Sequence, residues 1–86
     1  MHESGLVRDL MARVEQEVDG APGTVRSLRF RVGALSGIGS ESLRQGARHY
    51  ALEVWSHVPE IEVEESTDPT EPNALGVVLV SIGLGG

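Results

Sequence analysis

The sequence contains no cysteine, and this absence excludes disulfide bonds, zinc sites built from thiolates, iron–sulfur clusters and a cysteine nucleophile. Any metal must therefore be held by nitrogen and oxygen ligands. Lysine is absent as well, so all seven basic residues are arginines, and 13 acidic residues bring the formal net charge to -6. An acidic chain of this kind does not track phosphates, and we expect no nucleic acid partner.

Aromatic residues and long apolar runs are also scarce. Trp, Tyr and Phe occur once each, so the expected core consists mainly of Leu, Val, Ile and Ala. The most apolar stretch, residues 76–84, is too short to cross a bilayer, and no signal-peptide core is recognisable. We therefore expect one cytoplasmic domain over residues 1–86, without membrane association.

Hydrophobic periodicity predicts two helices separated by a strand. Apolar residues at every fourth position predict an amphipathic helix over about residues 4–19. Alternation over residues 24–34 predicts a strand with one buried and one solvated face. A second helix is expected after Ser40, its predicted N-cap, and should end before Pro59. The stripes expected to be buried are Leu6, Leu10, Val14 and Val18 in the first helix, and Leu43, Ala47, Tyr50, Ala51 and Val54 in the second.

Two further strands complete the predicted sheet. Ile61 and Val63 alternate with glutamates, which predicts a short strand with an acidic, solvated face. A turn-rich connector at residues 66–73 leads to a third strand over residues 75–84. The first two strands can be parallel, whereas the second and third are close enough for a hairpin. The predicted fold class is α+β, in the order helix, strand, helix, strand, strand, with a three-stranded mixed sheet and two helices on one face.

The third strand is apolar on both faces, although two helices can cover only one face of the sheet. We expect one of two sets of side chains to stay partly exposed and to bind a second copy or a client protein. The alternative is a central strand covered by the connector and the stems of Arg29 and Arg31. The two sets are Leu75, Val77 and Leu79, and Val78, Val80 and Ile82. The main interface candidates are Val78, Leu79, Val80 and Ile82.

The first three residues, Met1, His2 and Glu3, form the strongest metal-binding pattern. The free amine of Met1, the amide of His2 and the Nδ1 atom of its imidazole can close fused chelate rings around one metal. The amide or carboxylate of Glu3, or a group from elsewhere, can fill the fourth corner of a square plane. Nitrogen-rich tetragonal sites suit Ni(II) or Cu(II), and binding releases protons.

The same N-terminus, running directly into an amphipathic helix, resembles the start of the HypA/HybF family of hydrogenase and urease nickel metallochaperones. Similar segments follow at residues 28–37 (LRFRVGALSG), 41–43 (ESL), 61–64 (IEVE) and 78–82 (VLVSI), and together they extend over nearly the whole chain. The resemblance implies Ni(II) bound through Met1, His2 and Glu3. It also implies two partners, a HypB-like GTPase and the large subunit of a hydrogenase.

Two departures from the family pattern bear on function. Family members carry a zinc-binding lobe with two CxxC pairs where this chain has only residues 66–73, so no zinc is expected. Gly39 and Ser40 stand where the family often has an acidic residue and a proline, which leaves Glu3 or Glu41 as substitute ligand or docking residue. One hypothesis is a nickel-binding accessory protein for a nickel enzyme, with a [NiFe] hydrogenase as the expected client. The other is a HypA-derived interaction or assembly subunit that no longer delivers nickel.

The remaining histidines, His49 and His57, are expected to have surface or half-buried structural roles. The sequence contains no arrangement of Ser, His and Asp typical of a catalytic triad, no glycine-rich phosphate loop and no His-x-x-x-His pair at helical spacing. We therefore expect no enzymatic activity.

Overall fold

The computed structural model describes residues 3–85, with side chains from residue 5 onward. Its elements confirm the predicted α+β order of helix, strand, helix, strand, strand. They are helix α1 (Glu3–Glu17), the 3-10 turn η1 (Pro22–Thr24), strand β1 (Val25–Val32), helix α2 (Ser40–Tyr50), its π-helical extension η2 (Ala51–Trp55), strand β2 (Glu60–Glu65) and strand β3 (Val77–Leu84). No helix among these described residues is long and apolar enough to cross a membrane.

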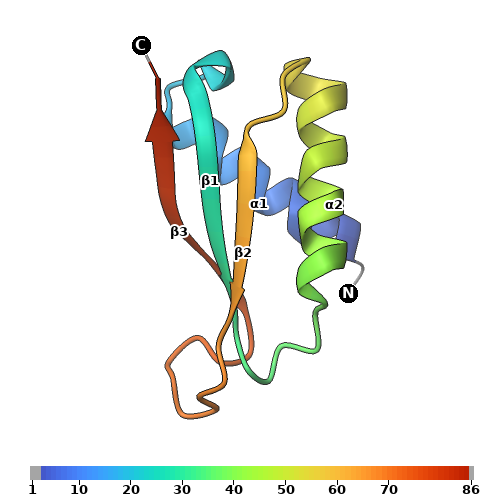
Figure 1. The fold of residues 1–86 in the computed structure, drawn as a ribbon, viewed down its shortest axis with the longest axis vertical. Coiled ribbons are helices and arrows are strands. Elements are labelled where there is room, and N and C mark those ends of the chain that lie inside the picture. Colours follow the sequence, from blue (N-terminus) through green and yellow to red (C-terminus); the bar gives the residue numbers. More distant parts are fainter. Residues whose placement is uncertain (1–2, 86) are drawn as a thin grey trace.

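The sheet is mixed, and its strand order is β2-β1-β3. The predicted parallel pairing of β1 and β2 is confirmed. The predicted hairpin between β2 and β3 is wrong, because β3 pairs antiparallel with the opposite edge of β1. The connector passes beneath the end of β1 to reach that edge (Figure 1), where the Gly33 and Leu35 amides donate hydrogen bonds to the Gly76 and Ala74 carbonyls, both at 2.8 Å.

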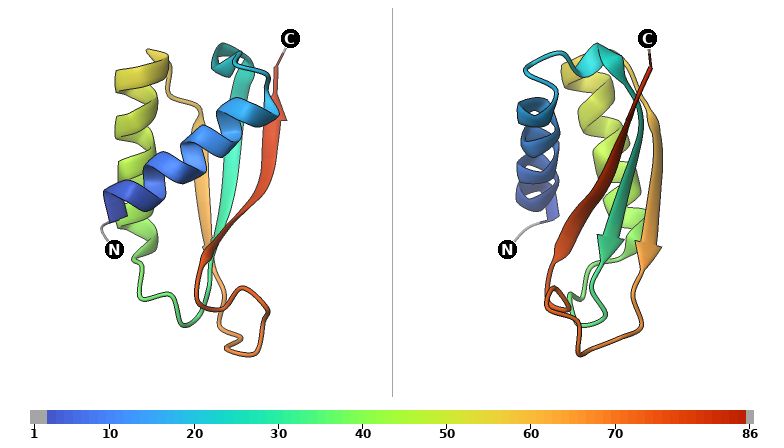
Figure 2. Two further views of the ribbon diagram at one scale, coloured as in Figure 1. Left: turned by 180° about the vertical axis from the view of Figure 1, so that it is seen from behind. Right: turned by 90° about the vertical axis from the view of Figure 1, so that its left-hand side faces the viewer.

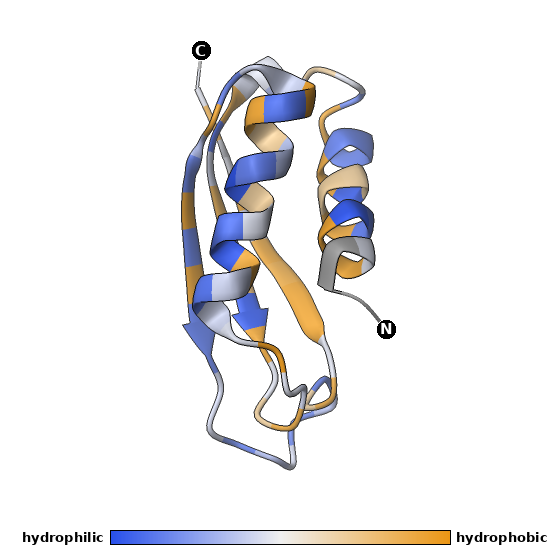
Figure 3. Ribbon diagram, turned by 90° about the vertical axis from the view of Figure 1, so that its right-hand side faces the viewer, coloured by the Kyte–Doolittle hydropathy of each residue, from blue (hydrophilic) through white to orange (hydrophobic). Residues whose placement is uncertain are grey.

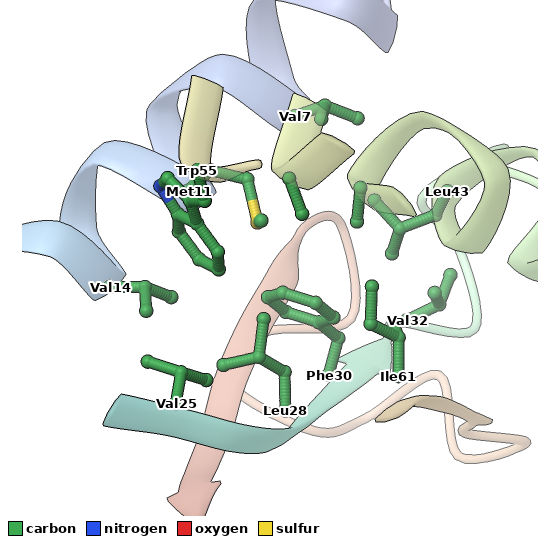
Figure 4. Packing of buried hydrophobic residues seen from close by; sticks show 12 residues of the cluster. Val7, Met11, Val14, Val25, Leu28, Phe30, Val32, Leu43, Trp55 and Ile61 are labelled. Carbon is green, nitrogen blue, oxygen red and sulfur yellow. The ribbon is translucent and has the colours of Figure 1, made fainter. Parts of the chain in front are cut away.

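Both helices cover the same face of the sheet, as predicted (Figure 2). The alternation in β1 is also confirmed, since Leu28, Phe30 and Val32 are buried while Arg29 lies on the solvated face. Figure 4 shows the β1 side chains packed beneath residues of α1 and α2, with Phe30 fully buried near the centre. Burial of each such side chain stabilises the fold by about 1.5–3 kcal/mol.

Helix α1 is rotated relative to the prediction. Val14 is buried as expected, but Leu6, Leu10 and Val18 are only half-buried, and Val7 and Met11 are buried in their place. The apolar surface of α1 is wide enough for either orientation. A glycine in α2 decides between them, because a Cβ atom at Gly46 would lie only 3.0 Å from Val7 Cγ2. Because Gly46 has no side chain, the side of α1 that carries Val7 can pack against α2.

Helix α2 starts at Ser40, so the N-cap is Gly39 rather than Ser40, and no side chain caps it. The predicted burial of Leu43, Ala47 and Ala51 is confirmed, and Tyr50 is half-buried. Val54 is 56% exposed, contrary to prediction, whereas Trp55 is 8% exposed. The cause is η2, since a π turn holds an extra residue and rotates Trp55 into the position that Val54 would occupy in an α-helix.

Strand β3 begins at Val77, two residues later than predicted, and Leu75 lies before it, 77% exposed. The register with β1 shifts at Val80, which forms a β-bulge between Leu79 and Ser81. Because a bulge interrupts alternation, Ile82 faces the core together with Val77 and Leu79. The predicted set of Val78, Val80 and Ile82 therefore does not share one face.

Candidate functional site

The predicted nickel site lies at the start of the chain. Met1 and His2 are outside the described residues, and Glu3 is the first residue of α1. In any α-helix the first four amide groups have no carbonyl partner within the helix. The backbone amide of Glu3 is therefore not required for the hydrogen-bond ladder of α1, so its use as a metal ligand would break no hydrogen bond of the helix.

The N-terminal part of α1 lies beside the N-terminal half of α2 (Figures 1 and 2). Between them lies a groove of about 440 Å³, whose walls include Val7 and Arg8 from α1 and Ser42, Gly46 and His49 from α2. The groove begins at Val7, about one helical turn after Glu3, the first described residue of α1.

Glu41, the second candidate ligand or docking residue, lies in the first turn of α2. Its carboxylate accepts hydrogen bonds from Arg44, at 3.2 Å from Nε and 2.7 Å from Nη2. These bonds lower the pKa of Glu41, so the side chain is ionised at neutral pH. Both side chains are exposed, so Glu41 can exchange Arg44 for a metal or a partner, although it must give up the ion pair to do so.

The two other histidines lie at the surface or half-buried, as expected. His49 is exposed on α2, with its Nε2 atom 3.6 Å from Glu53 Oε1. His57 Nε2 is 2.8 Å from the Val25 carbonyl oxygen and ties the end of α2 to the start of β1. Among the described side chains, those of residues 5–85, no group of three or more His, Asp or Glu is arranged to hold a metal ion.

The solvated face of the sheet carries ion pairs that were missed in the sequence. Arg29 Nη2 donates to Glu62 at 2.8 Å, and Arg31 donates to Glu64 at 3.4 Å and also to Glu71 of the connector. The Glu62 pair raises the pKa of Arg29, and the Glu71 pair raises that of Arg31. The glutamates of β2 lie at the surface, as interpreted, but two of them have partners. Matching alternation of Arg in β1 and Glu in β2 was the available signal.

The interface candidates lie along the edge strand β3. A groove of about 600 Å³ separates β3 from α1 and ends at Asn73. Its walls include the half-buried Leu6 and Leu10 of α1. On the β3 side it contacts all four candidates, Val78, Leu79, Val80 and Ile82. The alternative of a central third strand is wrong, although the connector and Arg31 do line a smaller cavity with Val78.

No family model, curated protein or solved structure matches the chain. The resemblance to the nickel metallochaperones therefore stays a prediction.

Proposed function

We propose that this chain is a cytoplasmic, non-enzymatic nickel-binding accessory protein that takes part in the maturation of a nickel enzyme, with a [NiFe] hydrogenase as the expected client. Ni(II) is the cargo, held by the amine of Met1, the amide and imidazole of His2, and the amide of Glu3. The resemblance implies delivery together with a HypB-like GTPase to the large subunit of the client.

The observation that carries the proposal is the sequence Met1-His2-Glu3, whose third residue is the first of α1. These residues supply nitrogen ligands in consecutive chelate rings, which suits Ni(II) better than zinc. The positive end of the α1 dipole repels a metal cation, but it also stabilises the negative charge of an amide that has lost its proton. The second effect offsets part of the first. Because the amide must lose that proton, nickel affinity should fall as the pH is lowered.

A second candidate is a HypA-derived interaction or assembly subunit that no longer delivers nickel. The connector favours it, because the ion pair between Arg31 and Glu71 holds this segment against β1, at the place where the family has its zinc lobe. The engaged carboxylate of Glu41 also favours it, since the substitute for the missing acidic residue is already paired.

Calorimetric titration of Ni(II) into untagged protein that begins at Met1 tests the proposal. We expect His2→Ala to abolish binding without loss of thermal stability. Acetylation of the Met1 amine should weaken binding at least about tenfold, or about 1.4 kcal/mol, since it removes the amine from the chelate. His49→Ala is the matched control, because it removes an exposed histidine of α2 and should leave the affinity unchanged.

Unchanged affinity in both the His2→Ala and the acetylated protein would refute the N-terminal site. An assay of nickel transfer to the client protein distinguishes the two candidate functions. A carrier should load nickel into the apo form of a hydrogenase large subunit in the presence of a HypB-like GTPase. An assembly subunit should bind the large subunit equally well with and without nickel and leave it empty.

A further inference from the structure

The two edges of the sheet are built differently. Strand β2 forms one edge, and four of its six residues are glutamates, which discourage pairing with another strand. Strand β3 forms the other edge, and its eight residues (VVLVSIGL) include no charged residue and no proline. The backbone of this uncharged edge can pair with another strand on either side of Val80, where the bulge interrupts regular pairing. Only β3 is therefore suited to extension of the sheet.

The surface beside this edge is apolar as well. Val80 in the bulge is 46% exposed, and the adjoining groove runs between β3 and the Leu6 and Leu10 side chains of α1. Figure 3 shows the first half of β3 as a continuous apolar ribbon between the two helices. A partner that pairs with β3 would also cover part of this groove.

The charges around the groove favour a second copy of the chain over a basic partner. Its rim carries two acidic residues and one arginine, Asp9, Glu17 and Arg13, whereas the whole chain carries a net charge of -6. Most of the negative charge therefore lies elsewhere, and two copies would repel one another least at this edge. Arg13 pairs with Glu17 at 3.4 Å in an exposed ion pair, which can be exchanged for an acidic residue of a second copy across a two-fold axis.

The available area sets the strength of such a contact. A strand of eight residues is about 26 Å long, and the molecule is 18 Å thick along its shortest axis. This side of the molecule therefore offers on the order of 500 Å² to a partner, below the roughly 800 Å² per partner of a standard interface. The contact should be weak, with a dissociation constant between about 1 µM and about 1 mM.

We propose that two copies of this chain associate through antiparallel pairing of their β3 edges, which joins two three-stranded sheets into one continuous sheet. The α1 helices flank the seam, and their Leu6 and Leu10 side chains become further buried. This association does not depend on nickel. In each copy it leaves the groove between the N-terminal part of α1 and α2 accessible.

Sedimentation equilibrium of the metal-free protein from about 1 µM to about 1 mM tests the proposal. We expect a monomer–dimer equilibrium that Val80→Lys weakens at least about tenfold, because the lysine occurs twice in a two-fold interface. Ser81→Lys, on an already polar and exposed residue of β3, should act in the same direction without a risk to folding. Leu52→Lys is the control, since Leu52 is 62% exposed on η2, outside the β3 edge and its groove.

Hydrogen exchange identifies the surface involved. Amides of β3 should become more protected as concentration rises, while those of β2 should not. A monomer at every concentration would overturn the proposal and leave the groove to a different partner. A dimer that is lost in Leu52→Lys but retained in both β3 variants would overturn it too, as would protection that rises on β2 instead of β3.

Discussion

Gly33 lies where the connector passes beneath the end of β1, and a single added methyl group tests that packing. A Cβ atom at Gly33 would lie 2.3 Å from the Ala74 carbonyl oxygen and 2.4 Å from that of Asn73. Favourable contacts between heavy atoms are about 3.5–4.0 Å. Both obstacles are backbone atoms, so no side chain can rotate away. In Gly33→Ala the connector must therefore move by about 1 Å or more.

The cost follows from what that movement disturbs. Overpacking of this kind costs about 1–3 kcal/mol. It also weakens the two hydrogen bonds from the Gly33 and Leu35 amides, each with a net contribution of about 0.5–1.5 kcal/mol. Alanine recovers about 0.4–1 kcal/mol by restricting the unfolded chain. The expected loss in unfolding free energy is about 2–4 kcal/mol, which lowers Tm by at least about 8 °C in a domain of this size.

Two other glycines provide matched controls for the same change. Gly5 in α1 has nothing within 4 Å of its Cβ position, so Gly5→Ala should stabilise the protein by about 0.5–1 kcal/mol through helix propensity. Gly46→Ala should be close to neutral, because the same gain is offset by displacement of the Val7 side chain. Urea denaturation of the three variants, followed by circular dichroism, gives the order of their unfolding free energies. If Gly33→Ala is as stable as Gly5→Ala, the connector is not held against β1 as described.

The remaining predictions concern two polar contacts. Glu15 Oε2 accepts hydrogen bonds from Trp55 Nε1 at 2.7 Å and Tyr50 Oη at 3.1 Å. Glu15→Ala should lower the unfolding free energy by about 1–3 kcal/mol, because it leaves the buried indole N–H unpaired. Glu15→Gln should retain most of that stability. Tryptophan fluorescence during denaturation measures both effects. Arg31 lowers the pKa of Glu71, so the stability from this pair is fully present above the unfolded pKa of about 4.3 and is lost as pH falls through the lower folded value. Denaturation midpoints from pH 7 to pH 3 should therefore fall less steeply in Arg31→Gln, and an unchanged slope would contradict a role for this pair.

Local patterns in the sequence were sufficient for the order of the elements. Alternation in β1 places Leu28, Phe30 and Val32 on one face in any sheet that pairs normally, because side chains of a strand point to opposite sides in turn. Helical periodicity identified α1 and α2 for a similar reason. The nickel site at Met1, His2 and Glu3 stays a prediction, which rests on consecutive residues whose chelate geometry depends only on the covalent chain.

Features that depend on contacts between distant residues could not be derived in this way. The rotation of α1 depends on the match between Val7 and Gly46. The burial of Trp55 depends on the π turn, and its indole N–H donates a hydrogen bond to Glu15 of the other helix. The ion pairs of Arg29 and Arg31 depend on the register of β1 against β2.

The place of β3 is the clearest case. Its residues are apolar on both faces, so the sequence by itself determined that they form a strand but not which neighbour it joins. Only the tertiary structure decided this, because the connector crosses beneath Gly33 and brings β3 to the free side of β1. That crossing leaves the acidic β2 at one edge and the uncharged β3 at the other. The physical reason is that strand pairing and the steric fit at Gly33 depend on contacts between residues about 40 positions apart. A local sequence pattern gives no information about the energies of such contacts.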